Sequence, residues 1–335
     1  MKKYIITIDA GTTNTRTFLW DDMKNLIASS REEIGVRNTA IDGNNKRLKS
    51  AVKSCLEDIL KQAKATYNEV KCIIASGMIT SNVGLIEIPH VVAPAGVQEL
   101  ASAIQSVMLE DICPLPIWFI PGVKNSAGNI SINNFEVMDI MRGEEVETLG
   151  MLKSINYDES LIIVLPGSHS KFIFIDKEGR ISGCLTTIAG EILDVITNHT
   201  IIADAVGHEH VNLEDYNEEF VLLGYKTAQK VGLSRACFSA RILNQFTQYS
   251  KREIANYILG VTLQSDLLAI KNSSVAKITP ETKIVVAGKE PLQSAFLLLF
   301  EKDQYFSNIE IFENSSNIPL TALGAYLVAE KSNIF

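Results

Sequence analysis

The chain has 335 residues, of which 46% are hydrophobic and 21% charged, and a formal net charge of -8 at pH 7. This length favours two domains, since single hydrophobic cores stop growing at roughly 250–300 residues. The acidic balance, with no basic stripe, opposes a nucleic-acid partner, and no window approaches the ~18 apolar residues of a membrane span. Five scattered cysteines without a C-x-x-C pair suit a reducing compartment. We expect a cytoplasmic globular protein that could still take an anionic small substrate.

The sequence pattern of the first half predicts a mainly parallel sheet in an α/β domain, with an added antiparallel hairpin. An apolar run, a small polar turn and an alternating run follow one another near the N-terminus, which predicts the hairpin. Strands then alternate with helices, as in α/β domains. The expected elements are strand 4–9, turn 11–14, strand 15–20, helix 45–66, strand 70–76, helix 96–109 and strand 117–120.

The second half opens in the same way as the first. Its expected elements are strands 160–165, 171–176 and 180–186, helices 189–205, 219–231, 234–247 and 251–271, strand 283–287, helix 290–301, strand 309–312 and helix 319–331. A strand, a small-residue turn and a second strand thus occur near residue 9 and again near residue 167. We interpret this as a weak internal repeat and expect domains at residues 1–150 and 151–335.

The turn after the first strand has the composition of a phosphate site. Gly11 allows backbone N–H groups to approach a phosphate, and Thr12 and Thr13 add hydroxyl donors. Asp9, at the end of the strand, is placed to hold Mg²⁺, largely through water. The alternative is a plain Asx-type turn, in which the same residue types are common. The segment is neither a Walker A loop nor a G-x-G-x-x-G fingerprint.

A second small-residue turn occupies residues 166–171, Pro-Gly-Ser-His-Ser-Lys. One such hairpin in each half could enclose a triphosphate from two sides, with Gly167, Ser168, His169 and Lys171 as the phosphate contacts. A hydrolase using Ser168 and His169 is the alternative. Neighbouring side chains in sequence rarely face each other, and the G-x-S-x-G elbow is not found.

An acidic segment, residues 138–150, lies between the two turns. Phosphorylation of a hydroxyl needs a carboxylate that accepts the proton and a cation that holds charged groups in line. Asp139, Glu144 and Glu145 offer the first, and Arg142 offers the second. The alternative is a solvated helix face that carries an acidic run.

Taken together, these motifs resemble the 2-dehydro-3-deoxygalactonokinase family within the actin-like ATPase and sugar kinase superfamily. The matching segments run in order over nearly the entire chain. They are D-x-G-T-T-N-x-R at 9–16, Gly77-Met78-Ile79 with Ser81 and Gly84, Glu87 with Pro89, Pro94-Ala95-Gly96, Pro121-Gly122, Asp139 with 141–145, 166–171, Gly190-Glu191, His199, 238–241 and Ala287-Gly288.

The resemblance implies two ribonuclease-H-like domains that hinge over a cleft. It also implies transfer of a phosphoryl group from ATP, with Mg²⁺, to the terminal hydroxyl of 2-dehydro-3-deoxy-galactonate in galactonate breakdown. The implied roles are Asp9 for the metal, Gly11, Thr12, Thr13, Gly167, Ser168, His169 and Lys171 for phosphates, and Gly288 for adenosine. For catalysis they are Glu144 as base, with Asp139 in reserve, and Arg142; for the sugar acid they are Arg16, Gly77, Met78 and Ser81.

Two departures make the substrate less secure than the reaction. Leu85 stands where the family usually has tryptophan, in the segment assigned to sugar contact, and Ser168 stands where threonine is usual. A kinase for another sugar acid on the same fold and a nucleotide-driven switch or chaperone-like ATPase both stay open. His208 and His210 could bind a metal, but we expect a surface loop because no third ligand is placed. The family also allows a homodimer.

Overall fold

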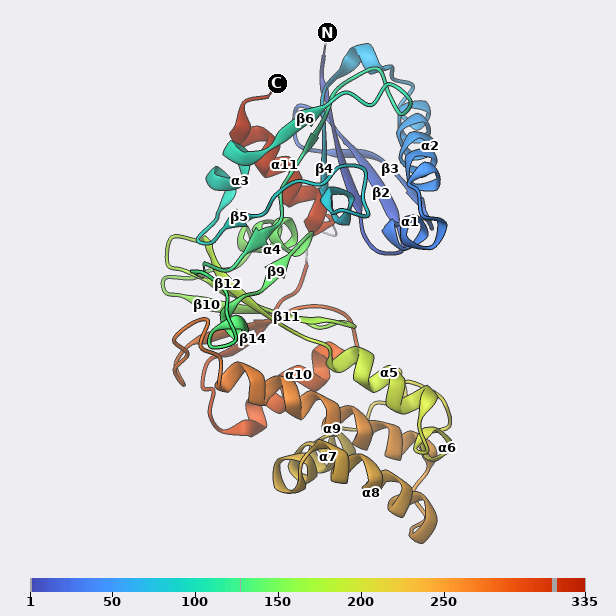
Figure 1. Ribbon diagram of the computed structural model, residues 1–335, viewed down its shortest axis with the longest axis vertical. Coiled ribbons are helices and arrows are strands. Elements are labelled where there is room, and N and C mark those ends of the chain that lie inside the picture. The colour runs from blue at the N-terminus through green and yellow to red at the C-terminus, as the bar shows by residue number, and fades with distance from the viewer. Residues whose placement is uncertain (1, 127, 315–317, 335) are drawn as a thin grey trace.

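Two sheets organise the part of the chain that the computed structural model describes, residues 2–126, 128–314 and 318–334 (Figure 1). The first has the strand order β3-β2-β1-β4-β7-β6. Its strands are β1 (Tyr4–Ala10), β2 (Thr15–Trp20), β3 (Leu26–Glu32), β4 (Val70–Gly77), β6 (Gln105–Val107) and β7 (Ile117–Phe119). Strand β1 pairs antiparallel with β2 and parallel with β4, so the predicted hairpin is built onto a parallel core.

The second sheet repeats this topology. Its order is β12-β11-β10-β13-β14, with β10 antiparallel to β11 and parallel to β13. The strands are β10 (Leu161–Leu165), β11 (Ser170–Ile175), β12 (Ile181–Thr187), β13 (Lys283–Val286) and β14 (Ile309–Ile311). In both sheets three antiparallel strands in sequence order are followed by two parallel ones. The expected α/β fold of two related halves is confirmed.

A small third sheet and one buried amide connect the halves. It contains β5 (Val91–Val92), β8 (Val123–Lys124) and β9 (Ile140–Met141). Asn125, which follows β8, donates from its side chain to the carbonyls of Val137 and Cys184 and accepts from the Cys184 N–H at 2.7 Å. The Asn125 side chain thereby satisfies the Cys184 backbone groups, which an open edge of β12 would otherwise expose.

The helices cover both sheets. They are α1 (Val36–Asp42), α2 (Lys46–Gln62), α3 (Val97–Ala103), α4 (Glu144–Leu152), α5 (Ala189–His199), α6 (Ala203–Val206), α7 (Glu218–Val231), α8 (Leu233–Phe246), α9 (Lys251–Lys271), α10 (Leu292–Asp303) and α11 (Leu320–Ser332), with 3-10 turns at Tyr67–Glu69, Met78–Thr80 and Phe135–Val137. Helix α2 shows why they form where they do: Leu48, Val52, Leu56 and Ile59 recur at helical spacing and are buried. Among the described helices, none is long and apolar enough to cross a membrane.

Most predicted elements lie within a few residues of the observed ones. The expected helix 96–109 is wrong beyond residue 103, since residues 105–107 pair with β7 as strand β6. The expected helix 189–205 is two helices, α5 and α6. Strand β3 and helix α1 were not predicted, because β3 is a largely polar edge strand and α1 is held at its start by the first turn.

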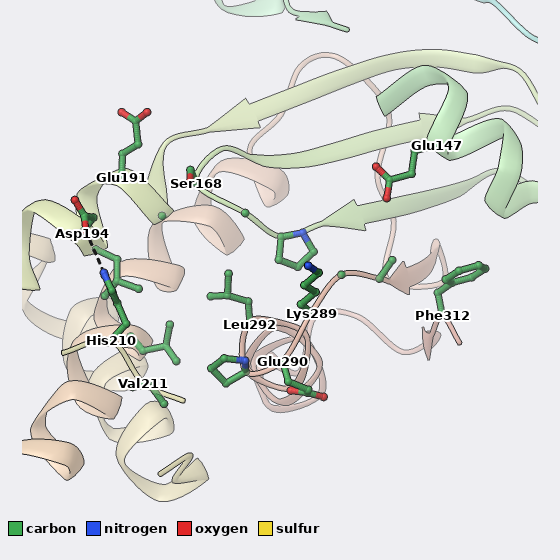
Figure 2. Close-up of a pocket in the computed structure, with 18 of the residues that line it drawn as sticks. Glu147, Ser168, Glu191, Asp194, His210, Val211, Lys289, Glu290, Leu292 and Phe312 are labelled. Carbon is green, nitrogen blue, oxygen red and sulfur yellow. Dashed lines mark hydrogen bonds and ion pairs between the residues drawn. The ribbon is translucent and has the colours of Figure 1, made fainter. Parts of the chain in front are cut away.

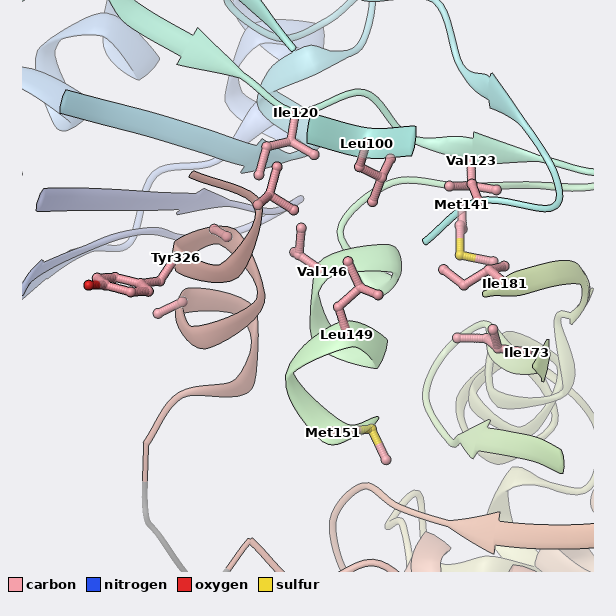
Figure 3. Packing of buried hydrophobic residues seen from close by; sticks show 14 of the residues in the cluster. Leu100, Ile120, Val123, Met141, Val146, Leu149, Met151, Ile173, Ile181 and Tyr326 are labelled. Carbon is pink, nitrogen blue, oxygen red and sulfur yellow. The ribbon is translucent and has the colours of Figure 1, made fainter. Parts of the chain in front are cut away.

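One hydrophobic core is shared by the two sheets. Alternate residues of β1 and β10 point to opposite faces: Ile5 and Ile163 belong to the shared core, while Ile6 and Ile162 belong to two separate outer clusters. Helices α4 and α11 lie side by side in this core and contribute Val146, Leu149 and Tyr326 among others (Figure 3). Helix α11 therefore packs with the first half although it ends the chain, and the division at residue 150 stays a proposal.

Candidate active site

The first turn is held rigidly from behind and is open in front. The Gly11 N–H donates to the Asn14 carbonyl at 2.9 Å, and the carbonyls of Gly11 and Thr12 accept from the first N–H groups of α1 at 3.1 and 2.9 Å. Gly35 permits this approach, since a Cβ there would lie 2.5 Å from the Gly11 oxygen. Apart from Gly11 and its two chain neighbours, no atom of the described residues lies within 4 Å of the position a Cβ would take at Gly11. The exposed face of the turn is thus free for a ligand.

Asp9 lies at the carboxyl end of β1, beside this turn. Its Oδ2 is 3.6 Å from Arg16 Nη1 and accepts a hydrogen bond from the Thr321 hydroxyl at 3.1 Å. Burial raises the pKa of Asp9, while Arg16 and the Thr321 hydroxyl oppose the rise. Gly77 crosses close to the carboxylate, because a Cβ there would be 3.3 Å from Oδ1, and its φ of 90° favours glycine. The end of β4 is therefore brought against Asp9.

The second turn rests on the start of α5. The Glu191 N–H donates to the Ser168 carbonyl at 3.2 Å, and Gly190 allows the contact, since a Cβ there would be 2.3 Å from the Gly167 oxygen. The His169 ring contacts Glu191 through Nε2 at 2.7 Å. Among the described residues no hydrogen bond joins Ser168 to His169, so the geometry does not favour the hydrolase alternative.

A cavity of 990 Å³ opens beside the second turn (Figure 2). Its walls include Gly167 and Ser168 of the turn, Gly288 after β13, Lys289, and Phe312 after β14. Gly288 has a φ of 101°, and a Cβ there would lie 2.9 Å from Pro166, so the backbone after β13 packs directly on the second turn. The volume is at the upper end of the range typical of small-molecule sites. Three of the predicted ligand contacts, Gly167, Ser168 and Gly288, thus share one cavity.

Glu147 is a cavity residue that sequence reasoning missed. It projects from α4 at one end of the cavity that Ser168 also lines (Figure 2). Burial raises the pKa of Glu147 to about 7, with the nearby carboxylates of Glu144 and Asp9 adding to the rise and Arg16 opposing it. Glu147 therefore lies between the first turn and the second. Its helical spacing from Glu144, i and i+3, was the available signal, because both then share one face.

The acidic segment contains one partly exposed carboxylate, Glu144, and one buried carboxylate, Glu145. Gly143 turns the chain into α4 with a φ of 109°, and the Arg142 N–H donates to Glu144 Oε2 at 3.0 Å. Glu145 is fully buried; its Oε2 accepts the Gly143 N–H at 2.7 Å, and its Oε1 has no partner among the described residues. Burial raises the pKa of Glu145 to about 8. Glu145 is thus a core group and Glu144 is the more accessible of the two.

Arg142 connects the acidic segment to the predicted sugar segment. Its Nη1 donates to the Thr80 hydroxyl at 2.8 Å and its Nη2 to the Ile88 carbonyl at 2.7 Å. Thr80 in turn donates to the Gly77 carbonyl at 3.0 Å. The same segment holds Ser81, whose hydroxyl donates to the Met78 carbonyl at 2.7 Å. The guanidinium therefore fixes residues 77–81 beside Gly143 and Asp9.

Comparison with known proteins assigns the chain to a family. The sequence matches the family described as 2-keto-3-deoxy-galactonokinase over residues 9–309. The chain belongs to the 2-keto-3-deoxy-galactonokinase family. A 2-dehydro-3-deoxygalactonokinase of Escherichia coli strain K12 is 27% identical over 198 residues, 59% of this chain and 58% of that relative. A Rhizobium meliloti strain 1021 protein, provisionally assigned to the same enzyme, is 26% identical over 203 residues, 61% of this chain and 59% of its own length.

The aligned region thus spans less than two thirds of either curated relative. The fold similarity extends further. A crystal structure from Sinorhizobium meliloti, provisionally assigned as a 2-dehydro-3-deoxygalactonokinase, superposes with a TM-score of 0.77 at 20% identity and covers 98% of both chains. This member of the 2-keto-3-deoxy-galactonokinase family therefore shares the fold of that protein over nearly its whole length.

Of the predicted site residues of this family member that do not line the cavity, Lys171 and Asp139 lie close together. The Lys171 ammonium donates to the Ile140 carbonyl at 2.8 Å and to the Thr186 hydroxyl. The Asp139 carboxylate accepts from the same Thr186 hydroxyl at 2.9 Å. Both side chains thus meet at a junction between β9, β11 and β12.

The histidine loop supplies no shared ligand set. His208 contacts Asp204 at 3.2 Å, whereas His210 contacts Asp194 at 3.0 Å in the cavity wall. Within residues 2–126, 128–314 and 318–334, no group of three or more His, Cys, Asp or Glu side chains is arranged to hold a metal ion. A metal at Asp9 would accordingly need ligands from water or a bound nucleotide.

Proposed function

We propose that the chain is an ATP-dependent carbohydrate kinase that phosphorylates the terminal hydroxyl of 2-dehydro-3-deoxy-galactonate in galactonate catabolism. The observation that carries this proposal is the family match over residues 9–309. Two glycine-hydroxyl hairpins, one on each related sheet, support a nucleotide-dependent reaction. The cavity beside the second hairpin supports a bound small molecule.

The residues present fit a magnesium nucleotide. Glycines at positions 35, 190 and 288 leave room where a side chain would obstruct the turns or their supports. Mg²⁺ is commonly held by one or two carboxylates together with phosphates and water, and we assign Asp9 and the neighbouring Glu147 to it. When bound, Mg·ATP supplies the transferable phosphoryl group and neutralises its charge. Thr12, Thr13, Ser168 and His169 offer donors on the two turns, and Gly288 admits the adenosine.

We assign the sugar acid to the side of Asp9 that faces away from the proposed nucleotide. We assign Gly77, Met78 and Ser81 to contact with the sugar, and Arg16 offers a cation for the substrate carboxylate. Glu144, at the first turn of α4, is assigned as the base that accepts the hydroxyl proton. Arg142 positions this segment through Thr80 and Ile88. Because the transition state of phosphoryl transfer is loose, positioning should matter more than base strength.

The test is ADP release by the purified protein with Mg·ATP and a panel of acceptors. The panel contains 2-keto-3-deoxygalactonate, 2-keto-3-deoxygluconate and glycerol, with a no-acceptor control. We expect strong stimulation by the galacto acid. Release without acceptor dependence would contradict the kinase assignment and favour a nucleotide-driven switch.

One observation favours a second candidate, a kinase for a different sugar acid. Leu85 occupies the segment expected to contact sugar, and its N–H donates to the Ile79 carbonyl at 2.9 Å while the side chain packs on the first-half core. An aliphatic side chain there cannot stack or donate as an indole does. Stimulation by the gluco acid in place of the galacto acid would select this candidate.

A further inference from the structure

Lys171 is a buried cation whose donors are used within the protein. Its residue is 7% exposed. The ammonium donates to the Ile140 carbonyl at 2.8 Å and to the Thr186 hydroxyl. Among the described residues it forms no ion pair within 4.0 Å. A buried ammonium is costly unless its hydrogen bonds are satisfied, so these two contacts fix where the side chain lies.

Asp139 completes the same cluster from the other side. One carboxylate oxygen accepts the Thr186 hydroxyl at 2.9 Å and the Ile140 N–H at 2.7 Å, and the other accepts the Thr186 N–H. Because an ammonium can only donate, the Thr186 hydroxyl oxygen accepts a hydrogen bond from Lys171. The Thr186 O–H then donates its own hydrogen bond to Asp139. The charges of Lys171 and Asp139 are thus linked through one hydroxyl.

This cluster connects the two parts of the proposed site. Lys171 and Thr186 are register partners in β11 and β12, and Lys171 is the last residue of the second turn. Ile140 lies in β9, three residues before Gly143. Asn125 adds a hydrogen bond from its N–H to the Asp139 carbonyl at 2.9 Å. The second turn and the start of α4 therefore share one rigid support.

We propose that Lys171, Thr186 and Asp139 are positioning residues that set the spacing between the phosphate held at the second turn and the carboxylate of Glu144. The proposal rests on the proposed kinase function. It gives Lys171 and Asp139 a different role from phosphate ligand and base. Errors of about 1 Å in such spacing can lower a rate about a hundredfold, so the junction acts on the chemical step without touching the nucleotide.

The experiment compares Lys171→Met, Asp139→Asn, Thr186→Val and Thr186→Ser. We expect the first three to lower kcat at least about tenfold while the Kd of Mg·ATP changes less than about twofold. Thr186→Ser keeps the hydroxyl and should remain close to the parent protein. The double variant Lys171→Met with Asp139→Asn should be no slower than either single one, because both break the same unit. Lys177→Met, exposed in the turn between β11 and β12, is the matched control.

Three results would overturn the proposal. A Kd for Mg·ATP raised about tenfold by Lys171→Met at unchanged kcat would make Lys171 a phosphate ligand. Loss of kcat in Asp139→Asn with a silent Thr186→Val would make Asp139 the base. Unchanged amide hydrogen exchange at residues 140–146 in the folded Thr186→Val protein would show that the junction does not hold this segment. Amide hydrogen exchange does not require turnover, so it tests the junction even in an inactive protein. Failure of the parent protein to phosphorylate any of the acceptors would instead count against the proposed function.

Discussion

Buried carboxylates around the two turns differ in what their surroundings do to their charge. Asp9 and Glu147 both lie near Arg16, and Glu147 also lines the cavity, whereas Glu145 and Asp266 lie inside the protein. Burial raises the pKa of each, since a low-dielectric surrounding disfavours the charged form. Asp9 and Glu147 neighbour each other and share Arg16 as a nearby cation, which is why we assign those two to the metal.

Replacing Asp9 by Asn should remove that cation site. We expect kcat to fall at least about a hundredfold, because stabilisation of the charge on the transferred phosphoryl group is lost. In calorimetry, the affinity for ADP should depend less on Mg²⁺ than it does in the parent protein. Glu290→Gln removes a charge from the cavity wall, which Asp9 does not line, and is the control. Equal effects of the two changes would show a general charge effect instead of a metal site.

Asp266 predicts a pH dependence of stability that is independent of the site. It is fully buried on α9, neither oxygen has a well-aligned partner in the part of the chain that the structure describes, and burial raises its pKa to about 6. The native state therefore favours the protonated form, so the stability it contributes is present below pH 4 and lost as pH rises through 6. The difference between pKa values of 3.8 and about 6 corresponds to about 3 kcal/mol.

Asp266→Asn should remove the loss of stability that accompanies the rise in pH through 6. In urea unfolding between pH 4.5 and 7.5, the free energy of unfolding of the variant minus that of the parent should grow with pH and level off above 7. Asp58→Asn, exposed on α2, should show no such trend. A difference that shrinks with pH would mean that Asp266 is stabilised as an anion.

At the scale of elements, glycines set how closely helices approach the turns. Helix α1 contacts the first turn over Gly35, and α5 contacts the second turn over Gly190. In both cases helix N–H groups donate to turn carbonyls, so the turn is shaped by a following helix. Each proposed phosphate site therefore depends on the helix behind the turn as well as on the turn motif in the sequence.

Gly190→Ala tests this support. A Cβ would meet the Gly167 oxygen at 2.3 Å and the Ser168 Cα at 2.7 Å, so the second turn must move. We expect the Kd of Mg·ATP to rise about tenfold or more, since the turn no longer presents its donors correctly. Gly128→Ala, where nothing lies within 4 Å, is the control. Unchanged binding in calorimetry would exclude the second turn from the nucleotide site.

At the scale of the molecule, the shared core makes the halves interdependent. Helix α11 packs on α4, where a Cβ at Gly324 would lie 1.8 Å from the Val146 carbonyl. Its Thr321 reaches Asp9 across 312 residues of sequence. Unfolding of one half should therefore expose apolar surface of the other.

Gly324→Ala should destabilise the whole chain by about 3 kcal/mol through overpacking. Trp20 and Trp118 both report on the first sheet, while helix content lies largely in the second half. We expect tryptophan fluorescence and circular dichroism to give one coincident transition in both proteins, with Lys331→Ala as the control on the same helix. Two separated transitions would mean that the halves fold independently.

The sequence by itself determined the local structure and the chemistry of the turns. Apolar periodicity predicted the strands and long helices, and glycine-hydroxyl turns after two strands predicted both hairpins and the repeat, because these depend on neighbouring residues. Tertiary structure alone decided which distant groups meet: Glu147 and Thr321 beside Asp9, Glu145 in the core, and Lys171 with Asp139 at Thr186. Such meetings depend on how sheets and helices pack, and residue spacing along the chain does not encode that directly.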